Sequence, residues 1–177
     1  MIKKAAEFAR IAHEGEYRKG SRIPYIYHPM EVALLVAGMT RDRDVIAAAY
    51  LHDVLEDTPV TEGELEQAFG PRVLELVRFE TEDKALSWRE RKEHTICHLA
   101  DAPPEARMLT LADKLSNMRA TARDYLMMGD EVWLRFHEKA KTSHQWYAAG
   151  ILKALSGMNS FPEYQEMERL YKMVFGA

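Results

Sequence analysis

A nine-residue stretch, YLHDVLEDT, holds four ionisable side chains that could do chemistry together: His52, Asp53, Glu56 and Asp57. Alanine, leucine and valine fill the positions around them, which predicts a largely buried helix from about residue 42 to 58. Residues four apart share one face of a helix, so His52 is expected above Glu56. Buried carboxylates are costly unless they are paired or bound to a metal, and the stretch therefore indicates a metal site.

Each of these residues also has an ordinary structural interpretation when it is taken alone. Glu56 and Asp57 are near the end of the predicted helix and could simply be solvated, and His52 could be a core histidine with a satisfied hydrogen bond. Acidic side chains at a helix C-terminus are unfavourable with the helix dipole, however. Their presence there indicates a compensating cation.

A metal needs three or more ligands, and an adjacent His-Asp pair cannot complete a coordination shell. Two further candidates are His28, in the proline-flanked segment PYIYHP, and Asp113, a polar residue inside the apolar helical run LTLADKLSNMR. Two histidines and two aspartates with open positions suit a divalent metal such as Mn²⁺, Fe²⁺, Co²⁺ or Zn²⁺. The predicted metal ligands are His28, His52, Asp53 and Asp113.

Helical patterns must position these residues, because no convincing strand alternation occurs in the sequence. Two capping boxes, Thr61 with Glu64 and Ser87 with Glu90, predict helix starts, and Pro59 should end the helix that carries His52. The expected helices cover about residues 2–13, 30–39, 42–58, 62–69, 73–77, 88–99, 104–118, 131–155 and 164–174. We expect an all-α fold, a compact helical bundle with one domain over residues 1–177.

Composition narrows the range of partners. The formal net charge is -4, which argues against nucleic acid as the main partner but allows a small phosphorylated substrate. Cys97 is the only cysteine, so no intrachain disulfide is possible. No apolar run approaches the roughly 18 residues that span a bilayer, and the N-terminal segment lacks a secretory or transit pattern. We expect a cytoplasmic protein without a membrane partner.

The order His28, then His52-Asp53, then Asp113 resembles the HD superfamily of metal-dependent phosphohydrolases. Further segments resemble one branch, the RelA/SpoT-type alarmone hydrolases: RKGSRIPYIYHP, LHDVLEDT, FGPRVLELV followed by TEDK, and LADKLSNMR. These segments follow the family order along nearly the whole chain. The length is similar to that of a stand-alone small alarmone hydrolase, and we expect a helical bundle of the HD-domain type with no synthetase domain.

The resemblance implies a reaction and a metal. Enzymes of this branch remove the 3′-pyrophosphate from ppGpp or pppGpp, which gives GDP or GTP. The resemblance implies that Glu56 and Asp57 orient water and assist proton transfer. It also implies a single Mn²⁺ ion, held by the four predicted ligands.

For the nucleotide, the resemblance implies that Arg18 stacks on the guanine and that Asn117 lies near the sugar. Lys19 could reach the base or a phosphate. Lys114 is a candidate phosphate cation that could equally form a surface ion pair. Without the resemblance, each of these is an ordinary exposed residue. The apolar C-terminal stretch YKMVFGA could pack on the domain or on a second copy, so a homodimer is possible.

Two other functions are compatible with the sequence. Ser116 and Glu80 depart from the family pattern, which leaves open an HD phosphohydrolase that acts on another nucleotide, such as a nucleotide 2′- or 3′-phosphate or a nucleoside monophosphate. A non-catalytic nucleotide-binding regulator would keep the metal site without turnover. The intact Glu56-Asp57 pair counts against that regulator.

Overall fold

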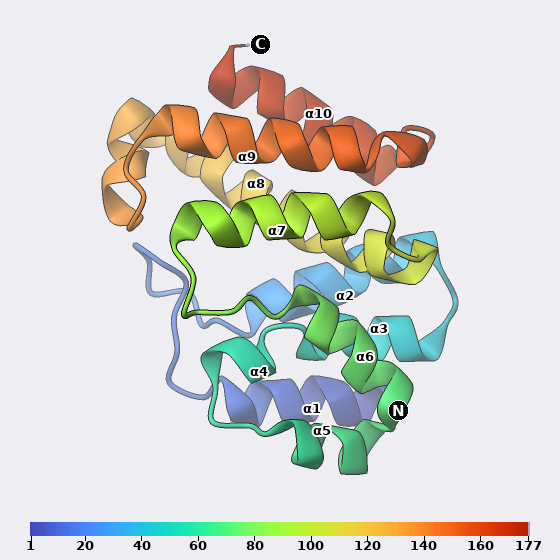
Figure 1. Cartoon of the computed structure of the whole chain (residues 1–177). Coiled ribbons are helices and arrows are strands. Elements are labelled where there is room, and N and C mark those ends of the chain that lie inside the picture. Colours follow the sequence, from blue (N-terminus) through green and yellow to red (C-terminus); the bar gives the residue numbers. More distant parts are fainter. Residues whose placement is uncertain (177) are drawn as a thin grey trace. The chain divides into compact units, whose positions relative to one another are not determined.

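The computed structural model describes residues 1–176, and the prediction of an all-α fold is confirmed there. No strand occurs among these residues, and one isolated antiparallel bridge joins Tyr17 to Pro24. In chain order the helices are α1 (Ile2–Ala12), α2 (Tyr27–Met39), α3 (Arg43–Leu51), α4 (Val54–Asp57), α5 (Glu62–Phe69), α6 (Pro71–Glu80), α7 (Trp88–Ala100), α8 (Pro104–Met128), the 3₁₀ helix η1 (Gly129–Arg135), α9 (Lys141–Ala154), the 3₁₀ helix η2 (Ser156–Met158) and α10 (Pro162–Phe175) (Figure 1).

The chain divides into two compact units. Unit 1 contains Met1–Glu82 and Pro104–Asp113, and unit 2 contains Asp83–Pro103 and the chain from Lys114 onward. Helix α8 therefore begins in unit 1 and ends in unit 2. The expectation of one domain over residues 1–177 stays a prediction.

Unit 1 is organised around α3, which packs against α1, α2 and α6. Three consecutive alanines, Ala47, Ala48 and Ala49, are fully buried in α3, and their small side chains let neighbouring helices approach from several sides. The side chain of Asp42 caps the helix by accepting the backbone N–H of Asp44 at 2.9 Å. This short buried helix ends where the candidate metal site begins.

Both predicted capping boxes are confirmed. The Thr61 hydroxyl accepts the backbone N–H of Glu64, whose carboxylate accepts the backbone N–H of Thr61 at 2.8 Å. Ser87 and Glu90 form the same reciprocal pair at the start of α7. Each box satisfies amide donors that would otherwise lack a partner in the first turn of its helix.

The structure differs from the expected helices near the site. The helix predicted over residues 42–58 is interrupted: α3 ends at Leu51, His52 and Asp53 form a turn whose backbone angles stay in the right-handed helical region, and α4 begins at Val54. Helix α2 starts at Tyr27, so His28 lies in its first turn and not in a loop. The helix expected over residues 131–155 is split into η1 and α9.

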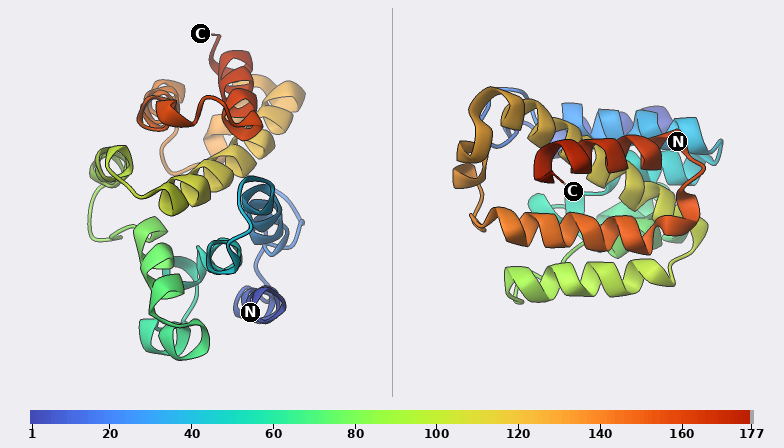
Figure 2. Two further views of the ribbon diagram at one scale, coloured as in Figure 1. Left: turned by 90° about the vertical axis from the view of Figure 1, so that its right-hand side faces the viewer. Right: turned by 90° about the horizontal axis from the view of Figure 1, so that it is seen from above.

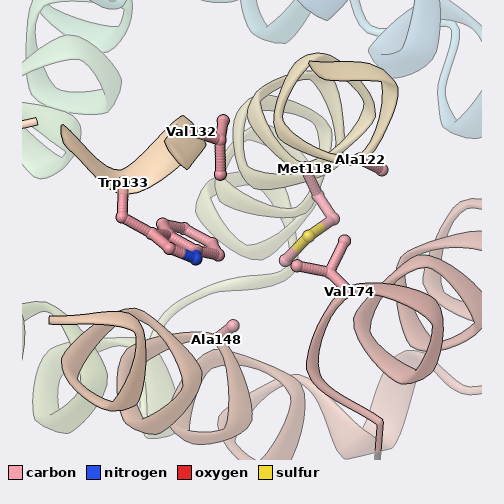
Figure 3. Packing of buried hydrophobic residues seen from close by; sticks show 6 residues of the cluster. All are labelled: Met118, Ala122, Val132, Trp133, Ala148 and Val174. Carbon is pink, nitrogen blue, oxygen red and sulfur yellow. The ribbon is translucent and has the colours of Figure 1, made fainter. Parts of the chain in front are cut away.

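Unit 2 has its own apolar core around Trp133, whose ring stacks on those of His144 and Phe175 with centroids 4.9 and 5.6 Å away. The buried members of this cluster are Met118, Ala122, Val132, Trp133, Ala148 and Val174 (Figure 3). Helices α7 and α9 run alongside each other, as do α9 and α10 (Figure 2). In residues 1–176, every helix is too short or too polar to cross a bilayer.

Candidate metal centre

Two helices of unit 1 and the turn after α3 supply the four predicted metal ligands. His28 is in the first turn of α2, and Asp113 is in the part of α8 that belongs to unit 1. His52 and Asp53 form the break between α3 and α4. The turn between the two helices therefore carries two consecutive candidate ligands.

The four side chains converge. His28 Nε2 lies 3.1 Å from Asp113 Oδ1 and 3.6 Å from Asp53 Oδ2. His52 Nε2 lies 2.9 Å from Asp53 Oδ2 and 3.7 Å from Asp113 Oδ1. Ligand atoms of His28, His52 and Asp113 all lie within 4.8 Å of one another, and these three residues are buried. Two ligands of one ion at about 2.1 Å would be about 3 Å apart, close to these spacings.

The hydrogen bonding of His52 suits a metal ligand. Its Nδ1 lies 2.9 Å from the backbone oxygen of Ala49, which is the acceptor for an Nδ1–H donor. Its Nε2 is buried and has no hydrogen-bond partner within the described residues, although it faces two carboxylates. A histidine fixed through one nitrogen with the other directed at carboxylates is the usual arrangement around a bound divalent ion. The residues present therefore fit a metal.

The electrostatics of the cluster favour a cation. Burial would raise the pKa of Asp53, but His52 and His28 lower this pKa well below its usual range. Burial opposes protonation of His52, yet Asp53 and Asp113 outweigh it and raise the pKa of His52 well above its usual value. Burial lowers the pKa of His28. The shifts of Asp53 and His52 show that the two carboxylates favour positive charge at this place, which a divalent ion would supply.

The predicted carboxylate pair lies on α4, directly after these ligands. Glu56 is half-buried and its Oε2 accepts the backbone N–H of Glu82 at 3.2 Å, whereas Asp57 is exposed. Burial raises the pKa of Glu56, and the neighbouring carboxylates of Asp57, Glu82 and Asp53 add to that rise. A carboxylate with a raised pKa is suited to accept a proton near neutral pH.

Tyr25 contacts one of the predicted metal ligands, and the sequence did not predict this contact. Its hydroxyl donates a hydrogen bond to Asp53 Oδ2 at 2.6 Å, across 28 residues of sequence. Burial and the Asp53 carboxylate raise the pKa of Tyr25 far above its ordinary value, so the hydroxyl stays protonated. The only available signal was a tyrosine in PYIYHP, three residues before His28.

The predicted substrate residues are not part of the converging cluster. Arg18 is half-buried and Lys19 is exposed, on the loop between α1 and α2. The Arg18 backbone N–H donates to the oxygen of Ile23 at 2.9 Å, which ties the loop back on itself. Lys114 is half-buried and Asn117 is exposed on the part of α8 that belongs to unit 2. Their roles in binding stay predictions.

An all-α fold whose histidines and aspartates converge beside a carboxylate pair defines a metal-binding protein of the hydrolase type. A family model described as "HD domain" matches residues 5–140. The chain belongs to the HD-domain family. The fit of the His28, His52 and Asp113 cluster to a divalent metal agrees with this membership.

Characterised relatives match over nearly the whole chain. The chain is 37% identical to guanosine-3′,5′-bis(diphosphate) 3′-pyrophosphohydrolase MESH1 of Xenopus tropicalis, covering 92% of this chain and 89% of that protein. It is 36% identical to MESH1 of Homo sapiens, covering 99% and 93%. A solved structure described as "A metazoan ortholog of SpoT hydrolyzes ppGpp and plays a role in starvation responses" superposes with a TM-score of 0.82 at 27% identity, covering 97% and 93%.

Proposed function

We propose that this protein hydrolyses guanosine 3′,5′-bis(diphosphate), releasing the 3′-pyrophosphate to leave GDP, or GTP from the pentaphosphate. One observation carries the proposal: two histidines and two aspartates converge directly before the Glu56-Asp57 pair. The relatives that share the fold over nearly their full length are 3′-pyrophosphohydrolases of this nucleotide. The protein is thus a hydrolase, and its partner is a small phosphorylated nucleotide.

His28, His52, Asp53 and Asp113 would hold the metal, and Mn²⁺ is our choice because a mixed imidazole and carboxylate set with open positions suits it. When bound, such an ion supplies Lewis acidity toward phosphate oxygens and activates water. Two carboxylates and two imidazoles leave no net positive charge in the protein's own ligand set. A divalent ion would supply the positive charge that a pyrophosphate group requires there.

The carboxylates of Glu56 and Asp57 handle the attacking water. Glu56 takes a proton from the attacking water, because burial has raised its pKa and the Glu82 N–H fixes one carboxylate oxygen. Asp57 orients that water. The bond from phosphorus to the 3′ oxygen breaks as the new bond from water to phosphorus forms, and the 3′ oxygen ends as a hydroxyl. The two phosphates of the 3′-diphosphate leave together as pyrophosphate.

We assign nucleotide binding to three cationic side chains and one asparagine. Arg18 would stack its guanidinium plane on the guanine, and Lys19 would reach the base or a phosphate. Lys114 and Asn117, which follow Asp113 on α8, would contact a phosphate and the sugar. Replacing Arg18 by alanine should raise KM more than it lowers kcat, because a base-stacking contact acts on binding.

Two residues, Glu80 and Ser116, depart from the family pattern. The Thr110 hydroxyl donates to the Glu80 carboxylate within unit 1. Ser116 is buried, with only 1% of its surface exposed. Glu80 therefore has a partner inside unit 1, and Ser116 is covered by the protein itself.

The test is an assay of purified protein with Mn²⁺ and ppGpp that measures pyrophosphate and GDP. We expect stoichiometric release of both, and Glu56→Ala should lower kcat by about 100-fold or more. Glu75→Ala, an exposed carboxylate on α6, is the matched control and should not change the rate. No pyrophosphate from ppGpp, with turnover of a nucleoside monophosphate or a 2′- or 3′-phosphate, would favour the other phosphohydrolase. Nucleotide binding without turnover in wild type would favour the regulator.

Location and assembly remain proposals. We infer a cytoplasmic protein from the single cysteine, which fits a reducing compartment. Val174 and Phe175 pack into the core of unit 2, so much of the apolar C-terminal stretch is covered by its own unit. Met173 stays 42% exposed and is the part that could meet a second copy. Light scattering of the purified chain measures whether a homodimer forms.

A further inference from the structure

Asp53 has one oxygen on which three side chains of unit 1 converge. Its Oδ2 accepts the Tyr25 hydroxyl at 2.6 Å and lies 2.9 Å from His52 Nε2 and 3.6 Å from His28 Nε2. The oxygen that faces both histidines is therefore the same oxygen that Tyr25 holds. A carboxylate oxygen has two lone pairs, so accepting the hydroxyl fixes the direction of the pair that remains.

Tyr25 is itself held at three points. Its backbone N–H donates to the Glu16 oxygen at 2.9 Å. Its ring lies against the His13 ring, with centroids 4.7 Å apart, and meets the His28 ring edge-on at 5.8 Å. A tyrosine fixed by its backbone and by both neighbours can present its hydroxyl in one place.

The neighbouring histidine is fixed as well. His13 is buried and its Nδ1 lies 2.6 Å from Glu16 Oε2, and Glu16 is the residue that also holds the Tyr25 backbone. The loop between α1 and α2, which carries Arg18, is thereby tied to the Asp53 carboxylate through Tyr25.

We propose that Tyr25 is a positioning residue of the metal centre, whose hydroxyl fixes the Asp53 carboxylate and so strengthens divalent-metal binding. Asp53 is the N-cap residue of α4, and its side chain makes no capping hydrogen bond there. Partners that hydrogen-bond to metal ligands typically change metal affinity by about 10- to 100-fold. The inference rests on the proposed metal role of Asp53 and not on the identity of the nucleotide.

The test measures Mn²⁺ binding to the metal-free full chain by titration calorimetry, without any nucleotide. Tyr25→Phe keeps the ring contacts and removes only the hydroxyl, and we expect the Kd for Mn²⁺ to rise by about 10-fold or more. The electron paramagnetic resonance spectrum of bound Mn²⁺ should also change, because one ligand is less fixed. Tyr27→Phe is the control: this tyrosine is two residues away and 58% exposed, and its loss should alter neither reading.

Two unnatural side chains separate the hydrogen bond from the shape. With 4-aminophenylalanine at position 25 an N–H donor remains, and Mn²⁺ affinity should be close to wild type. With 4-methylphenylalanine the same volume is filled without a donor, and affinity should fall as in Tyr25→Phe. This pair also keeps the test decisive if Tyr25→Phe does not fold.

Wild-type Mn²⁺ affinity and an unchanged spectrum in the methyl variant would overturn the proposal. Equal losses in the amino and methyl variants would overturn it too, because the effect would then be one of packing. Neither reading depends on ppGpp turnover. A protein that binds Mn²⁺ as expected but does not cleave ppGpp would contradict the proposed function and leave the role of Tyr25 supported.

Discussion

Glu56 is held where ionisation is unfavourable, which is useful for proton transfer and costly for the fold. Burial and the carboxylates of Asp57, Glu82 and Asp53 raise its pKa. The folded protein therefore binds this proton more tightly than the unfolded chain does. Stability is lost as pH rises from the unfolded pKa through the folded pKa, and the loss is complete above the folded pKa.

Glu56→Gln should stabilise the metal-free protein while it lowers activity. At neutral pH the amide removes the buried charge and can still accept the Glu82 N–H. We expect the melting temperature to rise by about 2–4 °C, the shift that about 1 kcal/mol produces at this size. Below the ordinary carboxyl pKa the gain should vanish, because wild-type Glu56 is then protonated. Melting curves at both pH values measure this, and a gain that persists in acid would contradict it.

Asp113 faces both histidines and should be needed for metal binding. Its Oδ1 lies 3.1 Å from His28 Nε2 and 3.7 Å from His52 Nε2. Asp113→Asn removes the charge with little change of shape, and Mn²⁺ affinity should fall by more than about 100-fold, beyond the effect of losing an outer hydrogen bond. Calorimetry measures the loss. Asp101→Asn, an exposed residue at the end of α7, should bind Mn²⁺ like wild type.

At the scale of single residues, chemical type singled out the candidate ligands but not the side chain that contacts them. Histidines and aspartates inside apolar runs are recognisable because burying them needs a reason. Tyr25 gave no such signal, since a tyrosine beside a proline is ordinary and its acceptor lies 28 residues away. The hydrogen bond exists only once α2 and α3 pack together, and spacing along one chain segment cannot reveal it.

At the scale of elements, local chemistry predicted the helix starts. The capping boxes at Thr61 and Ser87 depend on residues three apart, so the sequence contains all of their parts. The break at His52-Asp53 was not predicted, because the apolar pattern continues across it. The contacts made at this turn, from Tyr25 to Asp53 and from His52 to Asp113, are tertiary.

Helices α7 and α9 approach closely at Gly150. A Cβ atom there would lie 2.4 Å from Ile96 Cδ1 and 3.0 Å from Ile96 Cγ1. Gly150→Ala gains helix propensity of about 1 kcal/mol but overpacks the contact, which costs about 1–3 kcal/mol. We expect the free energy of unfolding to fall by about 1 kcal/mol, measured by urea denaturation.

Two further variants decide whether the contact is the cause. Ile96→Val removes the Cδ1 atom, so adding it to Gly150→Ala should recover part of the lost stability. Gly63→Ala, in α5, has no atom within 4 Å of the added Cβ and should stabilise by about 0.5–1 kcal/mol. A Gly150→Ala variant as stable as Gly63→Ala would show that Ile96 adjusts freely.

At the scale of the whole molecule, the sequence predicted the all-α fold class but gave no sign of two compact units. Helical periodicity and the absence of strand patterns are spread over the entire chain, and they sufficed for an all-α fold. The two compact units share α8 and are joined without a composition change, so no linker marks them. Their apolar cores differ, and all four candidate ligands fall in unit 1.

Because all four candidate ligands are in unit 1, metal binding should slow hydrogen exchange there. An ion that binds only the folded form stabilises it by about 2.7 kcal/mol at 100 times its Kd. Hydrogen exchange with and without Mn²⁺ should show slower exchange in peptides that contain His28, His52 and Asp113. If the units open independently, peptides from α9 and α10 should exchange at unchanged rates. The Asp113→Asn variant should show no metal effect in any peptide.

The alternative outcome is equally informative about cooperativity. If Mn²⁺ slows exchange in α9 and α10 as much as in α2 and α3, the metal has raised the free energy of one global unfolding step, and the single-domain prediction for residues 1–177 holds. The two results differ because amides report the smallest opening that exposes them. Helix α8 decides intermediate cases: protection that stops beyond Asp113 marks the boundary between the two units inside one helix.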